Sequence, residues 1–292
     1  PVMSSRLILG LCAFLAGCMP KAPPPPAPGP VTYTVGNPYQ VGGEWRYPRE
    51  FGAYDVTGLG IIIAHDDDPY TADNELYDPD GLMAASPVLP LPSIITITNL
   101  VNGRSLQVRV NERGPNVPGR VIAVTPRVAR LLDFPSGGVV EVEVKLNTQA
   151  SSALQGALGA GPKLQAAPVA GITAQALGAP GSAGPIGAAH QLVQTNDNTP
   201  RNAGPTLSGQ VIQAQPAPGP LWVQLPGYGN ESDAARVMAR LYGMPARIVP
   251  VFGGDRTLWA VNIGPYHSVE DADQALQHVL NAGMTDPEII VR

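Results

Sequence analysis

The sequence predicts a mixed fold class: a mainly β domain, then a flexible linker, then a smaller α+β domain. Residues 94–110 alternate apolar and polar side chains on both sides of an Asn-Gly pair, which predicts a β-hairpin. Residues 147–220 lose nearly all charged and aromatic side chains. Residues 221–292 regain them in an order that predicts strand, helix, two strands, helix and strand.

The composition limits the possible functions. The chain has 292 residues, enough for two domains, and a net charge of −5 without a basic stripe. A nucleic-acid partner is therefore not expected. The 33 prolines and 33 glycines indicate long non-globular connections. Because Cys12 and Cys18 are the only cysteines, no disulfide or cysteine metal site is possible later in the chain.

The N-terminus reads as a targeting segment. Residues 7–16 form an apolar run too short to span a bilayer, and it ends in Leu15-Ala16-Gly17-Cys18. Residues 1–18 thus resemble a bacterial lipoprotein signal cleaved before Cys18, whose thiol would carry acyl chains that hold the protein on a membrane. An ordinary secretory signal is the alternative. Residues 19–32 are proline-rich and are expected to form an extended spacer.

Residues 33–146 are expected to form the β domain, with an N-terminal lead at residues 33–48. The aromatic residues of the lead are expected to pack on the domain, and sugar binding is the alternative. Strands are expected at residues 60–64, 94–110, 121–124 and 140–146, with a helix that begins at Thr125-Pro126. About six strands would close into a barrel, which removes free edges. His65 and the three following aspartates are expected to be a solvated loop rather than a metal site.

The central hairpin brings Glu112 and Arg113 to a Gly-Pro turn. A rigid hairpin that presents an acid and a base at its end is a candidate site. A salt bridge between these two side chains that stabilises the turn is the alternative.

The segments Asn99-Leu100-Val101-Asn102-Gly103-Arg104-Ser105, Val110-Asn111-Glu112-Arg113-Gly114-Pro115 and Gly119-Arg120-Val121-Ile122 carry a family resemblance. They resemble the double-psi β-barrel domain of the rare lipoprotein A family. Proteins of that family are septal peptidoglycan lytic transglycosylases. The resemblance implies cleavage of glycan strands by a carboxyl group acting as acid and then as base, with a 1,6-anhydro product and no metal or cofactor.

The resemblance also implies the site residues. The catalytic acid of the family falls on Glu112, a second acid on Asp78, and its histidine on Ser86. Supporting positions are Glu75, Asn111 and Arg113. Glu112 is one methylene longer than the aspartate of the family, and Ser86 cannot carry a proton as an imidazole does. Two functions therefore stay open: an enzyme, or a catalytically degenerate lipoprotein that tethers the envelope to septal glycan.

Residues 147–220 are expected to be a flexible linker of Ala, Gly, Pro and Gln. Between residues 151 and 219 the only charged residues are Lys163, Asp197 and Arg201, and there is no aromatic residue. Such a segment buries too little to offset its ordering entropy. The relative orientation of the two domains is therefore expected to vary.

Residues 221–292 resemble a SPOR domain, a module that binds peptide-free glycan strands. Alternation along residues 221–225 predicts Val223 and Leu225 against the helices, with Trp222 and Gln224 on an open face. An open face with an aromatic ring and neutral amides suits a sugar. Ordinary exposed sheet residues are the alternative. The candidate glycan-binding residues are Trp222, Gln224, Tyr228, Asn262 and Tyr266.

Together these patterns predict a lytic transglycosylase-like lipoprotein that acts on denuded septal peptidoglycan. Its expected partners are glycan strands, a membrane through Cys18, and division-site proteins. Its expected location is the periplasmic side of the cell envelope, with the outer membrane as the default destination because no Asp follows Cys18.

Overall fold

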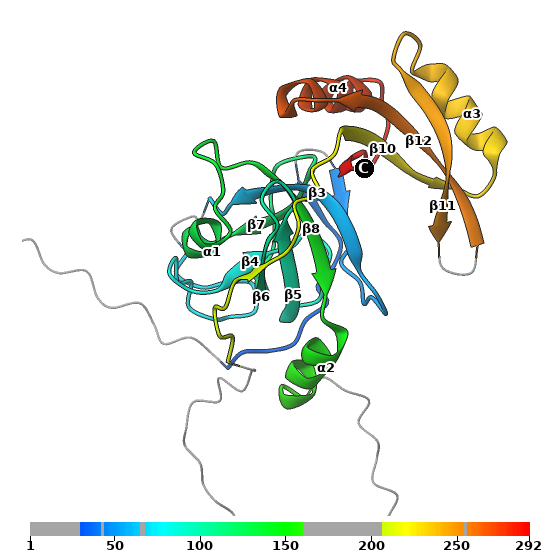
Figure 1. Ribbon diagram of the computed structural model, residues 1–292. Helices are drawn as coiled ribbons and strands as arrows, with labels where there is room; N and C mark the ends of the chain where they lie inside the picture. Colours follow the sequence, from blue (N-terminus) through cyan, green and yellow to red (C-terminus); the bar gives the residue numbers. More distant parts are fainter. Residues whose placement is uncertain (1–29, 42–43, 65–67, 160–205, 254–255) are drawn as a thin grey trace, which may run out of the picture.

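The computed structural model describes residues 30–41, 44–64, 68–159, 206–253 and 256–292 (Figure 1). The predicted signal, Cys18 and most of the predicted spacer lie outside these residues, as do residues 160–205 of the predicted linker. Within the described part of the chain, no helix is long and apolar enough to cross a membrane.

A closed six-stranded barrel forms the first domain, as predicted. Its order is β4-β7-β3-β8-β5-β6, and a further pairing of β4 with β6 closes it. The pairs β3–β7 and β4–β6 are parallel, whereas the other pairs are antiparallel. The strands are β3 (Asp55–Ile62), β4 (Met83–Ala85), β5 (Ser93–Asn99), β6 (Arg104–Glu112), β7 (Arg120–Val124) and β8 (Val140–Leu146).

The predicted hairpin is the β5–β6 pair, in which Ile95 lies opposite Val108 and Ile97 opposite Leu106. These side chains fill the barrel interior because apolar residues alternate along both strands. The prediction that Asn102-Gly103 by itself forms the turn of this hairpin is wrong. Residues 100–103 form a longer loop closed by the Gly103 N–H donating to Asn99 O, and of the Asn-Gly pair Gly103 alone adopts a positive φ.

One helix packs on the barrel after β7. Helix α1 (Pro126–Leu131) has Thr125 at its N-cap position and proline in its first turn, as predicted. The Thr125 hydroxyl does not cap the helix and donates instead to Gly81 O at 2.7 Å. The cap residue therefore ties the helix to the loop that precedes β4.

The linker prediction is wrong at its N-terminal end. The N-cap residue of helix α2 (Thr148–Ala157) is Asn147, whose side chain accepts a hydrogen bond from Ala150 N. The buried Ser151 hydroxyl accepts from Ile94 N and donates to Ile94 O, and Leu154 is buried. Ser151 pairs with the backbone of Ile94, and Leu154 supplies buried apolar area. These two residues dock the helix on the barrel, although the segment contains few large apolar side chains.

The linker prediction is also wrong at its C-terminal end. Strand β9 (Ile212–Gln213) pairs with Arg104 and Ser105 at the start of β6. Beyond it, Ala217 N donates to Leu100 O and Gly219 N donates to Glu141 Oε2. Backbone pairing with a strand edge needs no apolar side chain, which is why composition did not reveal it.

The C-terminal domain has the predicted order of elements. Its sheet runs β11-β12-β10-β13, and all its pairs are antiparallel. Asn230 and Ser268 cap the two helices by accepting from Asp233 N and Asp271 N. The elements are β10 (Leu221–Tyr228), α3 (Glu231–Arg240), β11 (Ala246–Gly253), β12 (Arg256–Tyr266), α4 (Val269–Asn281) and β13 (Glu288–Val291).

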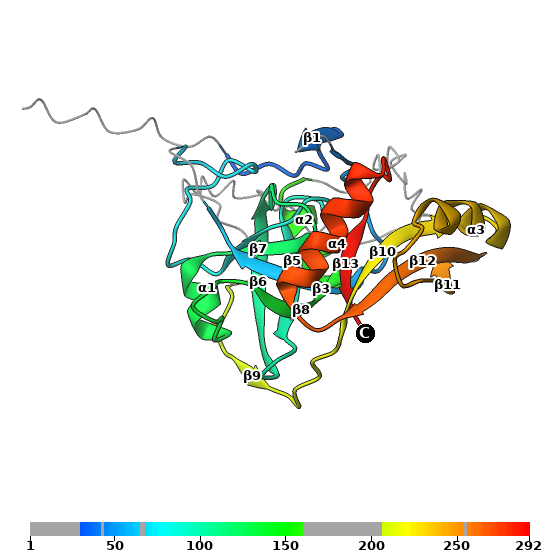
Figure 2. The same cartoon turned by 90° about the horizontal axis from the view of Figure 1, so that it is seen from above.

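The two domains are docked, contrary to the expected variable orientation. Figures 1 and 2 show β13 beside β3. The Arg120 guanidinium forms a bidentate ion pair with Asp273 of α4, with both N···O distances at 2.7 Å. Thr57 Oγ1 donates to Val291 O and accepts from Val291 N. A Cβ on Gly119, whose φ is +71°, would lie 2.7 Å from Leu276, so glycine permits this close approach.

Candidate functional site

The candidate acid Glu112 is the last residue of β6, at the end of the barrel where β6 pairs with β4. Its side chain is half-buried. Glu112 Oε2 accepts a hydrogen bond from Ala72 N at 3.1 Å, and Oε1 accepts from Arg113 N. Two backbone N–H groups therefore orient a carboxylate that keeps contact with solvent.

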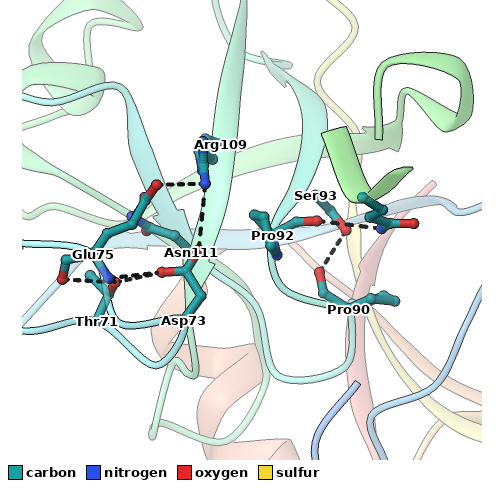
Figure 3. A network of polar contacts seen from close by, with 9 residues as sticks. Thr71, Asp73, Glu75, Pro90, Pro92, Ser93, Arg109 and Asn111 are labelled. Atoms are coloured by element: carbon teal, nitrogen blue, oxygen red, sulfur yellow. Dashed lines mark hydrogen bonds and ion pairs between the residues drawn. The ribbon is translucent and has the colours of Figure 1, made fainter. Parts of the chain in front are cut away.

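A polar cluster lies next to this carboxylate, between the loop at residues 71–75 and the end of β6 (Figure 3). Asn111 Nδ2 donates to Glu75 Oε2 at 2.7 Å, and the Arg109 guanidinium lies 2.5 Å from Glu75 Oε1. Asp73 N donates to Asn111 O. Ala72 N donates to Glu112, and the next residue, Asp73, belongs to the cluster. The loop at residues 71–75 therefore connects Glu112 to the cluster.

Asp73 was not among the residues selected from the sequence, yet it is fully buried at the centre of this cluster. Its Oδ1 accepts from Thr71 Oγ1 at 2.8 Å, and its Oδ2 lies 3.7 Å from Arg109. Burial, reinforced by the Glu75 charge, raises the pKa of Asp73 to about 6, against the opposing effects of Thr71 and Arg109. The two acids separated by one residue in Thr71-Ala72-Asp73-Asn74-Glu75 were the available signal.

Arg113 has a structural role in this arrangement. Its guanidinium donates to the carbonyl oxygens of Val35 (2.6 Å), Ser86 (3.4 Å) and Leu89. Burial lowers the pKa of Arg113, and the charge of Glu112 is among the opposing influences. The guanidinium therefore fastens the N-terminal lead and the loop after β4 to the Glu112 turn.

Two further residues selected from the sequence make local structural contacts. Ser86 is buried, and its Oγ accepts from Val88 N and Leu89 N, which gives it the role of a turn cap. Asp78 is exposed, and its Oδ1 accepts from Asp80 N within its own turn. Hydrogen bonds join Glu75, Asn111 and Glu112 through the loop at residues 71–75, whereas the side-chain bond of Asp78 stays within its own turn.

The N-terminal lead borders the site. The Tyr39 hydroxyl donates to Pro87 O at 3.2 Å. Burial raises the pKa of Tyr39, the Glu112 charge adds to this rise, and Arg113 and Arg46 oppose it. The Tyr39 side chain therefore interacts electrostatically with both Glu112 and Arg113.

The predicted open face of the C-terminal sheet is largely closed. Trp222 is 6% exposed and Asn262 is fully buried, so the exposure prediction is wrong for both. The Arg247 guanidinium lies over the Trp222 ring, 3.9 Å from its centroid. Gln224 is half-buried and donates to Asn262 Oδ1 at 2.8 Å. Tyr228 and Tyr266 are half-buried and pack against the helix-side core.

A cavity in the described part of the chain lies away from the candidate acids. In the described ranges no group of three or more His, Cys, Asp or Glu side chains could hold a metal ion, and His65, Asp66 and Asp67 lie outside those ranges. A cavity of about 530 Å³ lies between the lead, the barrel and α2. Its lining includes Tyr33, Ser93 and Gln155 but none of the residues selected for catalysis.

Comparisons with known proteins agree with this fold. Residues 63–144 match the lytic transglycolase family, and residues 217–290 match the SPOR domain family. The chain is 30% identical over 281 residues to the endolytic peptidoglycan transglycosylase RlpA of Pseudomonas aeruginosa, which covers 93% of this chain and 80% of that protein. This chain belongs to the RlpA (rare lipoprotein A) family.

Other RlpA proteins show the same relationship. The Escherichia coli K12 protein is 26% identical over 304 residues, covering 86% of this chain and 82% of that protein. The Yersinia pestis protein is 33% identical over 165 residues, covering 49% of this chain and 45% of that protein. The family resemblance predicted from the hairpin motifs is thereby confirmed.

Proposed function

We propose that this RlpA-family chain is a lytic transglycosylase that cleaves peptide-free septal glycan, with Glu112 as its acid and base. The supporting observation is the position of Glu112: a half-buried carboxylate oriented by Ala72 N and Arg113 N beside the Glu75–Asn111–Arg109 cluster. The names of the RlpA relatives support the reaction class.

In this proposal the protonated Glu112 donates its proton to the oxygen of the glycosidic bond, and that bond breaks. The resulting carboxylate accepts the proton of the sugar 6-hydroxyl, whose oxygen bonds to the anomeric carbon. The products are a free hydroxyl on one strand and a 1,6-anhydro ring on the other, and no water is consumed. Asp78 would act as a second acid at the rim, while Glu75, Asn111 and Arg113 hold the site in place.

The proposal extends to the location of the protein. We propose that acyl chains on Cys18 anchor the mature chain to the outer membrane on its periplasmic side. Septal wall and division-site proteins would then be its neighbours. Metabolic labelling of wild type and Cys18→Ala with a palmitate analogue tests this anchor: label that persists in the variant contradicts it.

The direct test of the activity is incubation of the chain from Met19 onward with denuded glycan strands. Anhydro-muramyl ends are then counted by mass spectrometry. Glu112→Gln should lower their production by at least about 10²-fold, because general acid-base catalysis contributes roughly 10²–10⁴-fold. Glu231→Gln, at the exposed start of α3, is the matched control and should leave the yield unchanged. Equal yields from wild type and Glu112→Gln would remove Glu112 from this role.

A second function is favoured by Ser86. Its buried hydroxyl caps a turn and does not titrate near neutral pH, so it does not replace the imidazole that the family resemblance implies at this position. The chain would then be a glycan-binding lipoprotein that tethers the envelope to septal wall. Retention by insoluble denuded glycan without any anhydro ends would support the tether over the enzyme.

A further inference from the structure

The N-terminal lead forms a β-hairpin with two different faces. Strand β1 (Tyr39–Val41) pairs with β2 (Glu44–Arg46), so that Tyr39 lies opposite Arg46 and Gln40 opposite Trp45. Opposed residues of an antiparallel pair project from the same face. Tyr39, Glu44 and Arg46 therefore share an inner face, whereas Gln40 and Trp45 share an outer face, and Tyr47, directly after β2, lies next to Trp45.

The inner face fixes the hairpin to the catalytic end of the barrel. The Tyr39 hydroxyl donates to Pro87 O, and Arg113, next to Glu112 in the chain, donates to Val35 O just before the hairpin. Glu44 is 8% exposed and pairs with Arg46 at 2.8 Å. Hydrogen bonds thus attach the hairpin to the surface that carries Glu112.

The outer face combines aromatic rings with an amide. Trp45 is 50% exposed and Tyr47 is 53% exposed, although both are large aromatic residues. Their ring centroids lie 6.5 Å apart and their planes are inclined by 30°. Gln40 is exposed on the same face. Two aromatic faces beside a neutral amide suit sugar rings, whose apolar faces stack and whose hydroxyls hydrogen-bond.

The position of this face favours a glycan over a lipid surface. A glycan strand continues on both sides of the bond that is cleaved, so it must cross surfaces next to Glu112. An anionic membrane would instead require unpaired basic side chains. Arg46 is paired with Glu44, Arg49 lies over the Phe51 ring, 4.9 Å from its centroid, and the adjacent Glu50 is an exposed acid that accepts from Tyr33.

On the basis of the function proposed above, we infer that Gln40, Trp45 and Tyr47 form a glycan-binding surface outside the barrel. This outer hairpin face stacks sugar rings of the same strand that is held at Glu112. It lies outside the segment at residues 63–144 that matches the transglycolase family.

The test compares Trp45→Ala/Tyr47→Ala with Tyr242→Ala in the chain from Met19 onward. Tyr242 follows the C-terminal end of α3, is 97% exposed and serves as the matched aromatic control. Binding to denuded glycan strands is measured by titration calorimetry, with strands of increasing length. The double variant should weaken binding of long strands about tenfold, which corresponds to about 1.4 kcal/mol, because both stacking rings are removed. Tyr242→Ala should bind as wild type does.

Each outcome separates the two proposals. If Glu112→Gln abolishes cleavage while the double hairpin variant binds long strands as wild type does, the hairpin inference is overturned and the proposed function stands. If wild type neither binds nor cleaves glycan, both are overturned. If the double variant loses sedimentation with vesicles of phosphatidylethanolamine and phosphatidylglycerol but keeps glycan affinity, the outer hairpin face binds lipid and the inference is wrong.

Discussion

The C-terminal sheet and the N-terminal hairpin carry the same pair of residue types in opposite environments. Trp222 and Gln224 belong to a four-stranded sheet, where Arg247 of β11 covers the indole and Asn262 of β12 bonds the amide. Trp45 and Gln40 belong to a two-stranded hairpin, and both are exposed. Neighbouring strands therefore decide whether an aromatic-amide face meets solvent, which the alternation of one strand cannot show.

The largest expected effect contrasts the two tryptophans. Trp222→Ala should lower the free energy of unfolding by about 3–5 kcal/mol, since it removes a large buried side chain. Trp45→Ala should change it by less than about 0.5 kcal/mol, because that ring is half exposed. Urea unfolding followed by circular dichroism measures both. Equal losses would show that the two faces do not differ in burial.

The next effect concerns Asp73, the buried acid of the barrel site. Its folded-state pKa of about 6 lies above the ordinary aspartate value of 3.8, so the folded chain binds the proton more tightly than the unfolded chain does. Stability should therefore fall as pH rises from about 4 to above 6, by at most about 3 kcal/mol.

Asp73→Asn removes this titration. The variant should gain stability relative to wild type at pH 8, and the gain should shrink at pH 4.5, as measured by urea unfolding at both values. A gain that is the same at both pH values would contradict a raised pKa.

A smaller effect concerns the contact between the barrel and the C-terminal domain. Arg120→Ala leaves Asp273, a partly exposed acid of α4, without its bidentate partner. We expect a loss of about 1–2 kcal/mol in domain docking, because the pair is only partly buried. Hydrogen exchange should then rise at Val291 and along β3. Unchanged exchange there would show that the ion pair does not maintain the docked state.

The smallest effect sharpens the comparison at the Trp222 ring. Arg247→Ala removes the cation over the indole and should lower stability by about 0.5–1 kcal/mol. It should also increase acrylamide quenching of Trp222, measured in a background with Trp45→Phe and Trp259→Phe. Quenching that does not change would mean that other groups cover the ring.

Local patterns predicted the elements better than the surfaces. Alternation placed β5 and β6 and the interior side chains Leu106, Val108 and Val110, because one face of each strand must be buried. Capping residues placed the starts of α3 and α4. Composition failed for α2 and β9, because docking there depends on backbone partners such as Ile94 and Ser105 that lie far away in the chain.

The candidate site shows the same division. Motif resemblance selected Glu112, Glu75 and Asn111, which the loop at residues 71–75 brings together. It did not reveal that Asp73 is buried or that Arg113 binds the N-terminal lead. Both facts depend on how the loop before β4 and the lead fold over the end of β6.

The sequence by itself determined the succession of strands and helices, the family and the residues available for chemistry, because periodicity, caps and motifs are local. Tertiary structure alone decided which of those residues meet solvent and how the two domains sit. Burial and ion pairing, as at Trp222 and between Arg120 and Asp273, require partners that are distant in the chain and close in space.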